Sequence, residues 1–211
     1  MFDGGSHTVS NLAVHESDSG VVGLFACVRD ARIYNLTVDG HTLTGAVVGY
    51  AYNSRLTAVS LMGVNAVVGH ENANQGVESV GGVIGGATNS LIDSCSAKAN
   101  VVLPDNSGKA GILCGGLEST SVINGYATGT LTAGDGCSEI GAVAGSVSDS
   151  EEITNCRSEN IRITVVERAA LGGMVGGSSA SADDGAFVLT DCTLSGATVN
   201  GEKAAMVGGG A

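Results

Sequence analysis

The sequence has no tryptophan and a single proline, Pro104, and aromatic residues make up only 3% of it. An ordinary globular core depends on large aromatic side chains, because each of them buries a large apolar area. Glycine, in contrast, occurs 34 times in 211 residues, about twice its usual share of ~7%. We therefore expect a core of small aliphatic side chains arranged in thin, closely stacked layers.

Basic residues are also scarce. Nine Lys and Arg residues stand against 21 Asp and Glu, which gives a formal net charge of −12. Binding to nucleic acid or to an anionic membrane surface takes much of its strength from clustered positive charge. We therefore expect no nucleic-acid partner. No apolar run reaches the roughly 18 residues of a membrane-spanning helix, so we expect no membrane insertion either.

The chain has neither a CxxC pair nor a signal peptide. Without a CxxC pair a structural zinc site is not expected, and no other cofactor is indicated. The first residues, Met1-Phe2-Asp3-Gly4, lack the basic and apolar segments of a secretory signal. Because the chain begins within a repeat, we expect it to be a fragment of a larger protein.

A glycine-rich unit recurs along the whole chain. When the units are aligned on their fourth residue, the interval between them averages about 30 residues, which is typical of a repeat architecture. The seven units are GLFACV (23–28), AVVGYA (46–51), GVIGGA (82–87), ILCGGL (112–117), AVAGSV (142–147), GMVGGS (173–178) and AMVGGG (205–210). The aligned residues are Ala26, Gly49, Gly85, Gly115, Gly145, Gly176 and Gly208.

A second unit lies between the glycine-rich units, and its third position is Asn or Asp in five of seven cases. Asn tolerates turn conformations and bonds to nearby backbone, and stacked Asn side chains form ladders along parallel strands. The third position therefore predicts a corner between two short strands. Its residues are Asn11, Asn35, Ala58, Ser94, Asn124, Asn155 and Asp191. The first position is apolar each time: Val9, Ile33, Leu56, Ile92, Val122, Ile153 and Leu189.

The residues after the corner alternate in polarity, with Leu36 and Val38 on one side and Thr37 on the other. This is the periodicity of a strand. Short strands, a period near 30 and the lack of an amphipathic helix together predict a right-handed parallel β-helix, or β-solenoid, of about seven coils. We expect residues 1–211 to form a single domain.

The segments GLFACV, GVIGGA and GMVGGS resemble the GLUG repeat, a short Gly-Leu-x-Gly motif, although Cys114, Ala142 and Ala144 depart from it. GLUG repeats are found in large bacterial surface proteins, adhesin-like proteins and some immunoglobulin A peptidases, where they form non-catalytic β-helical segments. The resemblance implies a structural or adhesive module that is secreted or on the cell surface, with a host protein or glycan as ligand. It carries over no catalytic residue, so we expect no enzyme activity.

The alternative is a carbohydrate-active β-helix, such as a polysaccharide lyase or a glycosidase. That enzyme would need clustered acids and a basic group that takes up a proton. The candidate residues are Asp135, Asp149, Glu151, Glu152, Asp183, Asp184, Arg157, Arg162 and Arg168. Because the acids lie in different loops, without the spacing of a calcium loop, any calcium is expected to be peripheral. His70-Glu71 lacks the second histidine of a metallopeptidase helix.

Cys156 and Cys192 are predicted in the same column of adjacent coils, with backbones about 4.8 Å apart. That separation is within the reach of a disulfide, but parallel stacking does not point the two Cβ atoms at each other. We therefore favour reduced, buried thiols and leave a bridge open. The histidines share no column and are not expected to bind a metal; they are His7, His15, His41 and His70.

Thr37 and Thr193 are predicted on one outer face, but Ser60, Ser96, Tyr126 and Arg157 interrupt it, so a flat threonine array for ice binding is not expected.

Neither end of the chain has the polar cap that solenoids need for solubility. Unpaired strand edges can add a further strand. We therefore expect end-to-end self-association.

Overall fold

The computed structural model describes residues 1–14, 22–39, 42–43, 46–63, 66–68, 79–149, 152–166, 170–179, 187–200 and 202–203. These residues form strands and turns, with no helix among them. The strands pair in parallel, apart from the short antiparallel pair β25 (Thr198–Val199) and β26 (Glu202–Lys203). The expected class, all-β with parallel strands, is therefore confirmed.

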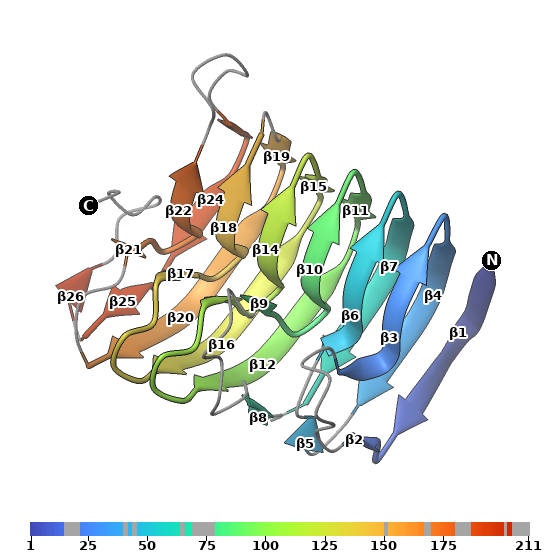
Figure 1. Ribbon diagram of the computed structural model, residues 1–211, viewed down its shortest axis with the longest axis horizontal. Coiled ribbons are helices and arrows are strands. Elements are labelled where there is room, and N and C mark those ends of the chain that lie inside the picture. Colours follow the sequence, from blue (N-terminus) through green and yellow to red (C-terminus); the bar gives the residue numbers. More distant parts are fainter. Residues whose placement is uncertain are drawn as a thin grey trace.

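The strands belong to three sheets (Figure 1). We call the six-stranded one the glycine sheet, the four-stranded one the short sheet and the 16-stranded one the corner sheet. The glycine sheet contains β3 (Gly23–Arg29), β6 (Ala46–Tyr52), β10 (Ile84–Thr88), β14 (Cys114–Glu118), β18 (Ala144–Ser148) and β22 (Val175–Ser179). The short sheet contains β9 (Ser79–Val80), β13 (Lys109–Gly111), β17 (Glu139–Gly141) and β21 (Ala170–Leu171).

The corner sheet is the largest because the chain enters it on both sides of each corner. Its strands are β1 (Phe2–Ser10), β2 (Ala13–Val14), β4 (Arg32–Asp39), β5 (Thr42–Leu43), β7 (Arg55–Met62), β8 (Ala66–Val68), β11 (Leu91–Asp93), β12 (Ser96–Leu103), β15 (Ser121–Ile123), β16 (Tyr126–Ala133), β19 (Glu152–Thr154), β20 (Arg157–Val165), β23 (Val188–Thr190), β24 (Thr193–Ser195), β25 and β26. Strands β4 and β7 run through the corner without a break, whereas later coils split into two strands.

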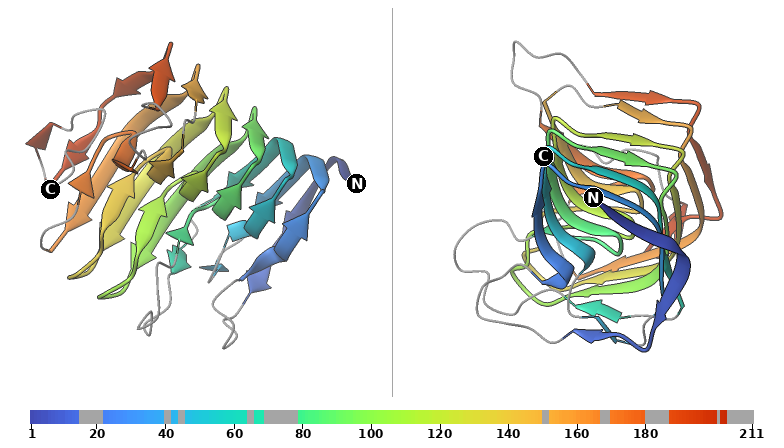
Figure 2. Two further views of the ribbon diagram at one scale, coloured as in Figure 1. Left: turned by 45° about the horizontal axis from the view of Figure 1, so that its top comes forward. Right: turned by 90° about the vertical axis from the view of Figure 1, so that its right-hand side faces the viewer.

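The chain passes through the sheets in a fixed order, from the short sheet to the glycine sheet and then to the corner sheet. One circuit runs through β13, β14, β15 and β16, and the next runs through β17, β18, β19 and β20. Each strand pairs with its counterpart in the next circuit, so that Ala110 pairs with Ile140 and Cys114 with Ala144. Figure 2 shows the circuits stacked in sequence order, with the strands around a common interior.

The predicted corner is a turn of the backbone through positive φ. The residues Asn35, Ala58, Ser94, Asn124, Asn155 and Asp191 have φ between 51° and 56°. This conformation is costly for most L-residues and easier for Asn and Asp, which explains why these two types predominate. The residues on either side of a corner point inward: Ile92 is 0% and Cys95 1% exposed. The corner prediction is therefore confirmed at these six positions.

The prediction for the first unit is wrong. Ile33 pairs with Phe2 rather than with a counterpart at Val9, and Val9 instead pairs with Val38. The first coil turns through Gly5 and Ser6, which have φ of 60° and 58°. Asn11 also has positive φ, at 56°, but it follows the end of β1. The same local pattern of apolar residue and Asn fits a turn at either end of a strand, so the sequence did not distinguish the two.

A second corner, which the sequence analysis did not predict, joins the glycine sheet to the corner sheet. Its residues are Asp30, Asn53, Asn89, Ser119 and Asp149, with φ between 44° and 64°. The backbone N–H groups of the first four donate to the next coil, as from Asn53 to the carbonyl of Thr88 at 3.0 Å and from Asn89 to that of Glu118 at 3.0 Å. Five successive coils of the described chain therefore contain two turns of the same conformation, stacked on those of their neighbours.

Buried hydroxyl groups follow the second corner in successive coils. The backbone N–H of Ser54 donates to Ser90 Oγ at 3.0 Å, and that of Ser90 donates to Thr120 Oγ1 at 3.1 Å. The Ser90 hydroxyl in turn donates to the carbonyl of Thr88 at 2.8 Å. This ladder satisfies backbone amides that burial separates from water. Ser or Thr two residues before the apolar first position is the sequence signal that could have revealed it.

The aligned glycines lie where the short sheet packs directly on the glycine sheet. An ideal Cβ on Gly115 would lie 2.5 Å from the backbone nitrogen of Val80, and one on Gly145 would lie 2.6 Å from that of Ala110. These distances exclude any side chain, so glycine lets the two backbones approach. The strand registers confirm the predicted alignment for six units, and the seventh, at 205–210, lies outside the described residues.

The core lies between the glycine sheet and the corner sheet. Its largest fully buried side chains are Leu36, Leu56, Leu61, Ile84, Ile92, Leu103, Ile112, Leu113, Leu131, Ile140 and Ile153. Among the described residues, Ser158 Oγ is the buried side-chain oxygen that has no hydrogen-bond partner. The cross-strand neighbours of Ser158 are Ala127 and Leu194, so its position is otherwise apolar.

We expect Ser158→Ala to raise the free energy of unfolding by about 1 kcal/mol, because an unsatisfied buried hydroxyl costs roughly 1–3 kcal/mol. Alanine already occupies the equivalent position of the preceding coil, at Ala127. The control is Ile153→Ala, which removes a fully buried side chain and should lower the free energy by about 2–5 kcal/mol. Urea denaturation followed by circular dichroism measures both. A Ser158→Ala variant less stable than its parent would contradict the prediction.

Candidate ligand-binding surface

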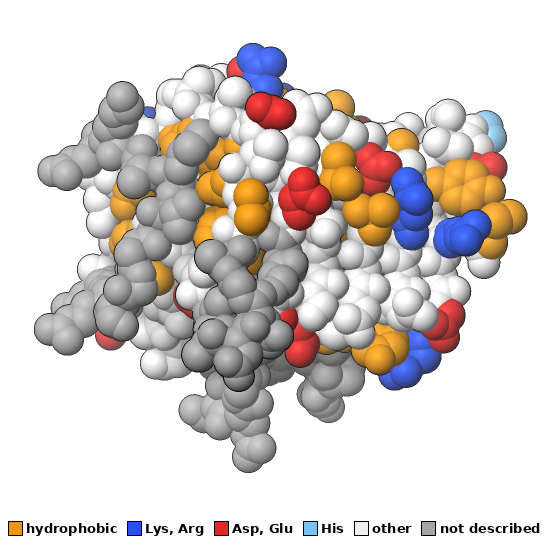
Figure 3. All heavy atoms as spheres, turned by 90° about the horizontal axis from the view of Figure 1, so that it is seen from above, with side chains coloured by type: hydrophobic (Ala, Val, Ile, Leu, Met, Phe, Trp, Pro, Cys, Tyr) orange, Lys and Arg blue, Asp and Glu red, His pale blue; other side chains and the backbone are white. Residues whose placement is uncertain are grey.

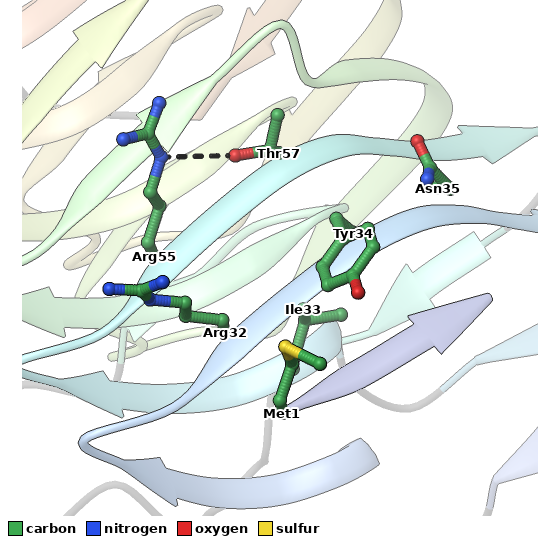
Figure 4. A pocket seen from close by; sticks show the side chains of 7 residues that line it. All are labelled: Met1, Arg32, Ile33, Tyr34, Asn35, Arg55 and Thr57. Carbon is green, nitrogen blue, oxygen red and sulfur yellow. Dashed lines mark hydrogen bonds between the residues drawn. The ribbon is translucent and has the colours of Figure 1, made fainter. Parts of the chain in front are cut away.

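A hollow opens on the outer face of the corner sheet, over β4 and β7 (Figure 4). Its volume is about 440 Å³, within the range of ~300–1,000 Å³ that is usual for ligand sites. The residues that line it are Met1, Arg32, Ile33, Tyr34, Asn35, Arg55 and Thr57. We call it the arginine hollow, after its two basic residues.

Strand alternation places the polar side chains of the arginine hollow outside. Ile33 and Leu56 are 2% and 0% exposed, so the residues on either side of each must point away from the core. Arg32 pairs across the strands with Arg55, and Tyr34 pairs with Thr57. In Figure 4 the two arginines extend on one side of the hollow, and the Tyr34 ring lies on the other.

Arg55 is held by two neighbours. Its Nη2 donates to Asp93 Oδ2 at 3.0 Å, and its Nε donates to Thr57 Oγ1 at 3.2 Å. The side chain still exposes 51% of its surface. No described residue forms an ion pair or a side-chain hydrogen bond with Arg32, although it lies beside Arg55.

Asp93 is fixed by the corner residues around it. Oδ1 accepts hydrogen bonds from Ser94 Oγ at 2.9 Å and from Asn124 Nδ2 at 3.2 Å. Asn124 in turn accepts from Asn155 Nδ2 at 2.6 Å, so part of the predicted Asn ladder exists. Partial burial opposes ionisation of Asp93, but the hydrogen bonds from Ser94, Asn124 and Arg55 outweigh it and lower its pKa. Asp93 is therefore a fixed carboxylate beside Arg55.

A second, smaller hollow of about 150 Å³ lies on the outer face of the glycine sheet. Tyr50 OH and Thr88 Oγ1 are 2.5 Å apart, and Thr88 Oγ1 donates to Glu118 Oε2 at 3.0 Å. Lys109 forms an ion pair with Glu139 at 3.1 Å. The polar groups of this hollow therefore bond largely to one another.

The side of the molecule that carries the second corner has no extended patch of one charge among the atoms drawn in colour. Figure 3 shows its acidic and basic side chains as small separate groups among uncharged ones. An open hollow of about 640 Å³ lies here. Arg32 and Arg55 border it as well as the arginine hollow, so both guanidinium groups can be reached from two directions.

The structure spreads the predicted acids and bases over the coil. Asp135 lies in the turn after β16, Asp149 at the second corner and Glu152 on β19. Arg157 and Arg162 lie on β20, where Arg157 forms an ion pair with Glu159. Glu151, Arg168, Asp183, Asp184 and the pair His70-Glu71 lie outside the described residues.

The described residues contain no group of three or more His, Cys, Asp or Glu side chains that could hold a metal ion. Of the histidines, His7 is exposed on β1, whereas His15, His41 and His70 lie outside the described part. The outer column that begins at Thr37 and ends at Thr193 has the predicted composition. Its members in between are Ser60, Ser96, Tyr126 and Arg157.

The six cysteines are all free, so no disulfide joins Cys156 to Cys192. The Cys156 thiol donates to the carbonyl of Thr154 at 3.5 Å, and the Cys192 thiol donates to that of Thr190 at 3.3 Å. Burial raises the pKa of Cys156, like that of Cys95, to about 12. These cysteines act as small core residues that also bond to the carbonyl before each corner.

The sheets and their registers define an all-β protein built from parallel, stacked repeats. Within it, residues 76–102 match the GLUG motif family. The matched segment includes β9, β10, β11 and most of β12, which together make one circuit through the three sheets. The chain thus carries a GLUG motif, and the motif corresponds to one coil. No curated protein matches the chain. No helix in the described part has the length and hydrophobicity to cross a membrane.

We expect Cys27 to react with iodoacetamide in the native protein, while Cys95, Cys114 and Cys156 do not. Cys27 is exposed and the other three are buried; the thiolate is the reactive form, and burial raises the pKa of Cys95 and Cys156 to about 12. Mass spectrometry after labelling at neutral pH, with a urea-denatured sample as control, measures the extent at each site. Rapid native labelling of Cys156 would contradict its burial.

Proposed function

We propose that residues 1–211 form one right-handed parallel β-solenoid of about seven coils, which acts as a non-catalytic structural or adhesive module of a secreted or cell-surface protein. Right-handed coiling is the general rule for parallel strands joined by a crossover in one sheet. The repeated columns and the GLUG motif at residues 76–102 support the repeat assignment. A host protein or a glycan would be the ligand.

The observation that carries this proposal is that the buried columns keep one kind of side chain while the exposed columns vary. The inward columns are aliphatic or small, as at Leu56, Ile92 and Val122, which are 0% exposed. The outward columns change chemistry from coil to coil, as from Ser96 to Tyr126 to Arg157. A stack of this kind gives a rigid support whose surface can vary without disturbing the core.

We expect the chain to bind a ligand without altering it. A glycan array and a panel of host surface proteins would test binding. Incubation with polysaccharides, followed by measurement of new reducing ends, would test turnover. Binding without new chain ends is the expected result, because the candidate acids Asp135, Asp149 and Glu152 lie at separate places on the coil. Release of new ends, above that of a heat-unfolded sample, would establish the carbohydrate-active alternative instead.

We also expect the 211-residue chain to self-associate more strongly as salt rises. In the described part of the chain, β1 and β3 each pair with a strand on one side only, and a free edge can add a further strand. The net charge of −12 opposes association, and salt screens this repulsion. Light scattering across a salt and concentration series measures the effect.

The matched variant for this test is Ala26→Lys, on the exposed edge strand β3. A charge on an edge strand blocks pairing, although the same change reduces the overall negative charge. Weaker association of Ala26→Lys would therefore locate the contact at this edge. A protein that stays monomeric at high salt and high concentration would contradict end-to-end stacking.

A further inference from the structure

Arg32 and Arg55 form a cross-strand pair of like charges on the outer face of the corner sheet. Residues directly opposite on neighbouring parallel strands lie about 4.8 Å apart at the backbone, and like charges in this position destabilise a sheet. The chain has only nine basic residues against 21 acidic ones. Two of the nine basic residues are therefore cross-strand neighbours, although acidic residues are more than twice as frequent in the chain.

The described residues neutralise only one of these two charges. Asp93 accepts from Arg55 through Oδ2, while its other oxygen accepts from Ser94 and Asn124. Arg32 forms no ion pair with a described residue. The pair thus keeps a surplus positive charge at the rim of a hollow of about 440 Å³.

The opposite side of the hollow offers a different kind of contact. Tyr34 presents a partly exposed ring from the same strand as Arg32, and Figure 4 shows this ring beside Ile33, with the two guanidinium groups on the far side of the hollow. An aromatic ring provides a flat apolar surface with a polar hydroxyl at its edge. Guanidinium groups bind carboxylates through two parallel hydrogen bonds.

We propose that the arginine hollow binds the carboxylate of an acidic sugar, with Arg32 and Arg55 on the carboxylate and Tyr34 against the apolar face of the sugar ring. A flat ring beside a cationic pair suits a cyclic ligand that carries its carboxylate directly on the ring. Arg32 makes the main contact, because Asp93 already engages Arg55. This inference rests on the proposed role as a binding module and names its ligand class.

The test is calorimetric titration of the 211-residue chain with trigalacturonate. We expect binding by the parent chain and a loss of about tenfold to a hundredfold with Arg32→Gln, because a hydrogen bond to a charged group contributes roughly 1.5–3 kcal/mol. The control Arg162→Gln makes the same charge change at an exposed position on β20 and should alter affinity less than twofold. Tyr34→Ala should weaken binding and Tyr34→Phe should largely preserve it.

Further ligands distinguish the ways in which the proposal can fail. The methyl ester of trigalacturonate should not bind, since it lacks the negative charge. Equal, Arg32-dependent binding of triglutamate would overturn the sugar assignment. If trigalacturonate does not bind while the glycan array gives other ligands, the arginine hollow is not the site, and the binding role stands. If trigalacturonate is cleaved, the non-catalytic role itself is wrong.

Discussion

In the described residues, the backbone of five successive coils turns through positive φ twice, at the same two places. A single L-residue in this conformation costs about 1–2 kcal/mol, and stacking offsets the cost because each corner amide bonds to the next coil. The N–H of Ser94 donates to the carbonyl of Ile123 and that of Asn124 to the carbonyl of Thr154, both at 2.9 Å. Ala58 shows how strong this constraint is: it has φ of 53° without the side-chain amide that makes the conformation easier for Asn.

Glycine is needed where the short sheet lies against the glycine sheet, because the two backbones come into direct contact there. An ideal Cβ on Gly176 would lie only 2.2 Å from the backbone nitrogen of Ile140. The GLUG motif at residues 76–102 therefore covers one coil. Its sequence must supply a residue that adopts positive φ at the corner and a glycine at the close backbone contact. The outer face of the glycine sheet carries only the smaller of the hollows described above, of about 150 Å³.

The sequence predicts those features that repeat in every coil. The corner residue, the apolar first position and the aligned glycine each recur at a fixed interval, so a comparison of units was enough to find them. The second corner was missed because its residues vary among Asp, Asn and Ser, and its buried hydroxyls resemble ordinary loop residues. The arginine hollow was not predicted, although the alignment of Ile33 with Leu56 already implies that Arg32 lies opposite Arg55. The hollow itself depends on how Met1, Tyr34 and the two arginines pack in space, which the alignment does not contain.

The corner residues also fix the position of a charged group, Asp93, on the outer face. Asn155 donates to Asn124, Asn124 donates to Asp93, and Asp93 accepts from Arg55. This chain of bonds fixes one carboxylate beside the hollow, with Oδ1 held by Ser94 and Asn124 and Oδ2 turned to Arg55. A mobile acid on a loop could turn to share itself between the two guanidinium groups, whereas Asp93 is held in place and its ion pair among the described residues is with Arg55. The corner that builds the coil therefore also leaves Arg32 without an ion-pair partner among the described residues, and it is this charge that the proposed site would offer to an anion on an otherwise acidic protein.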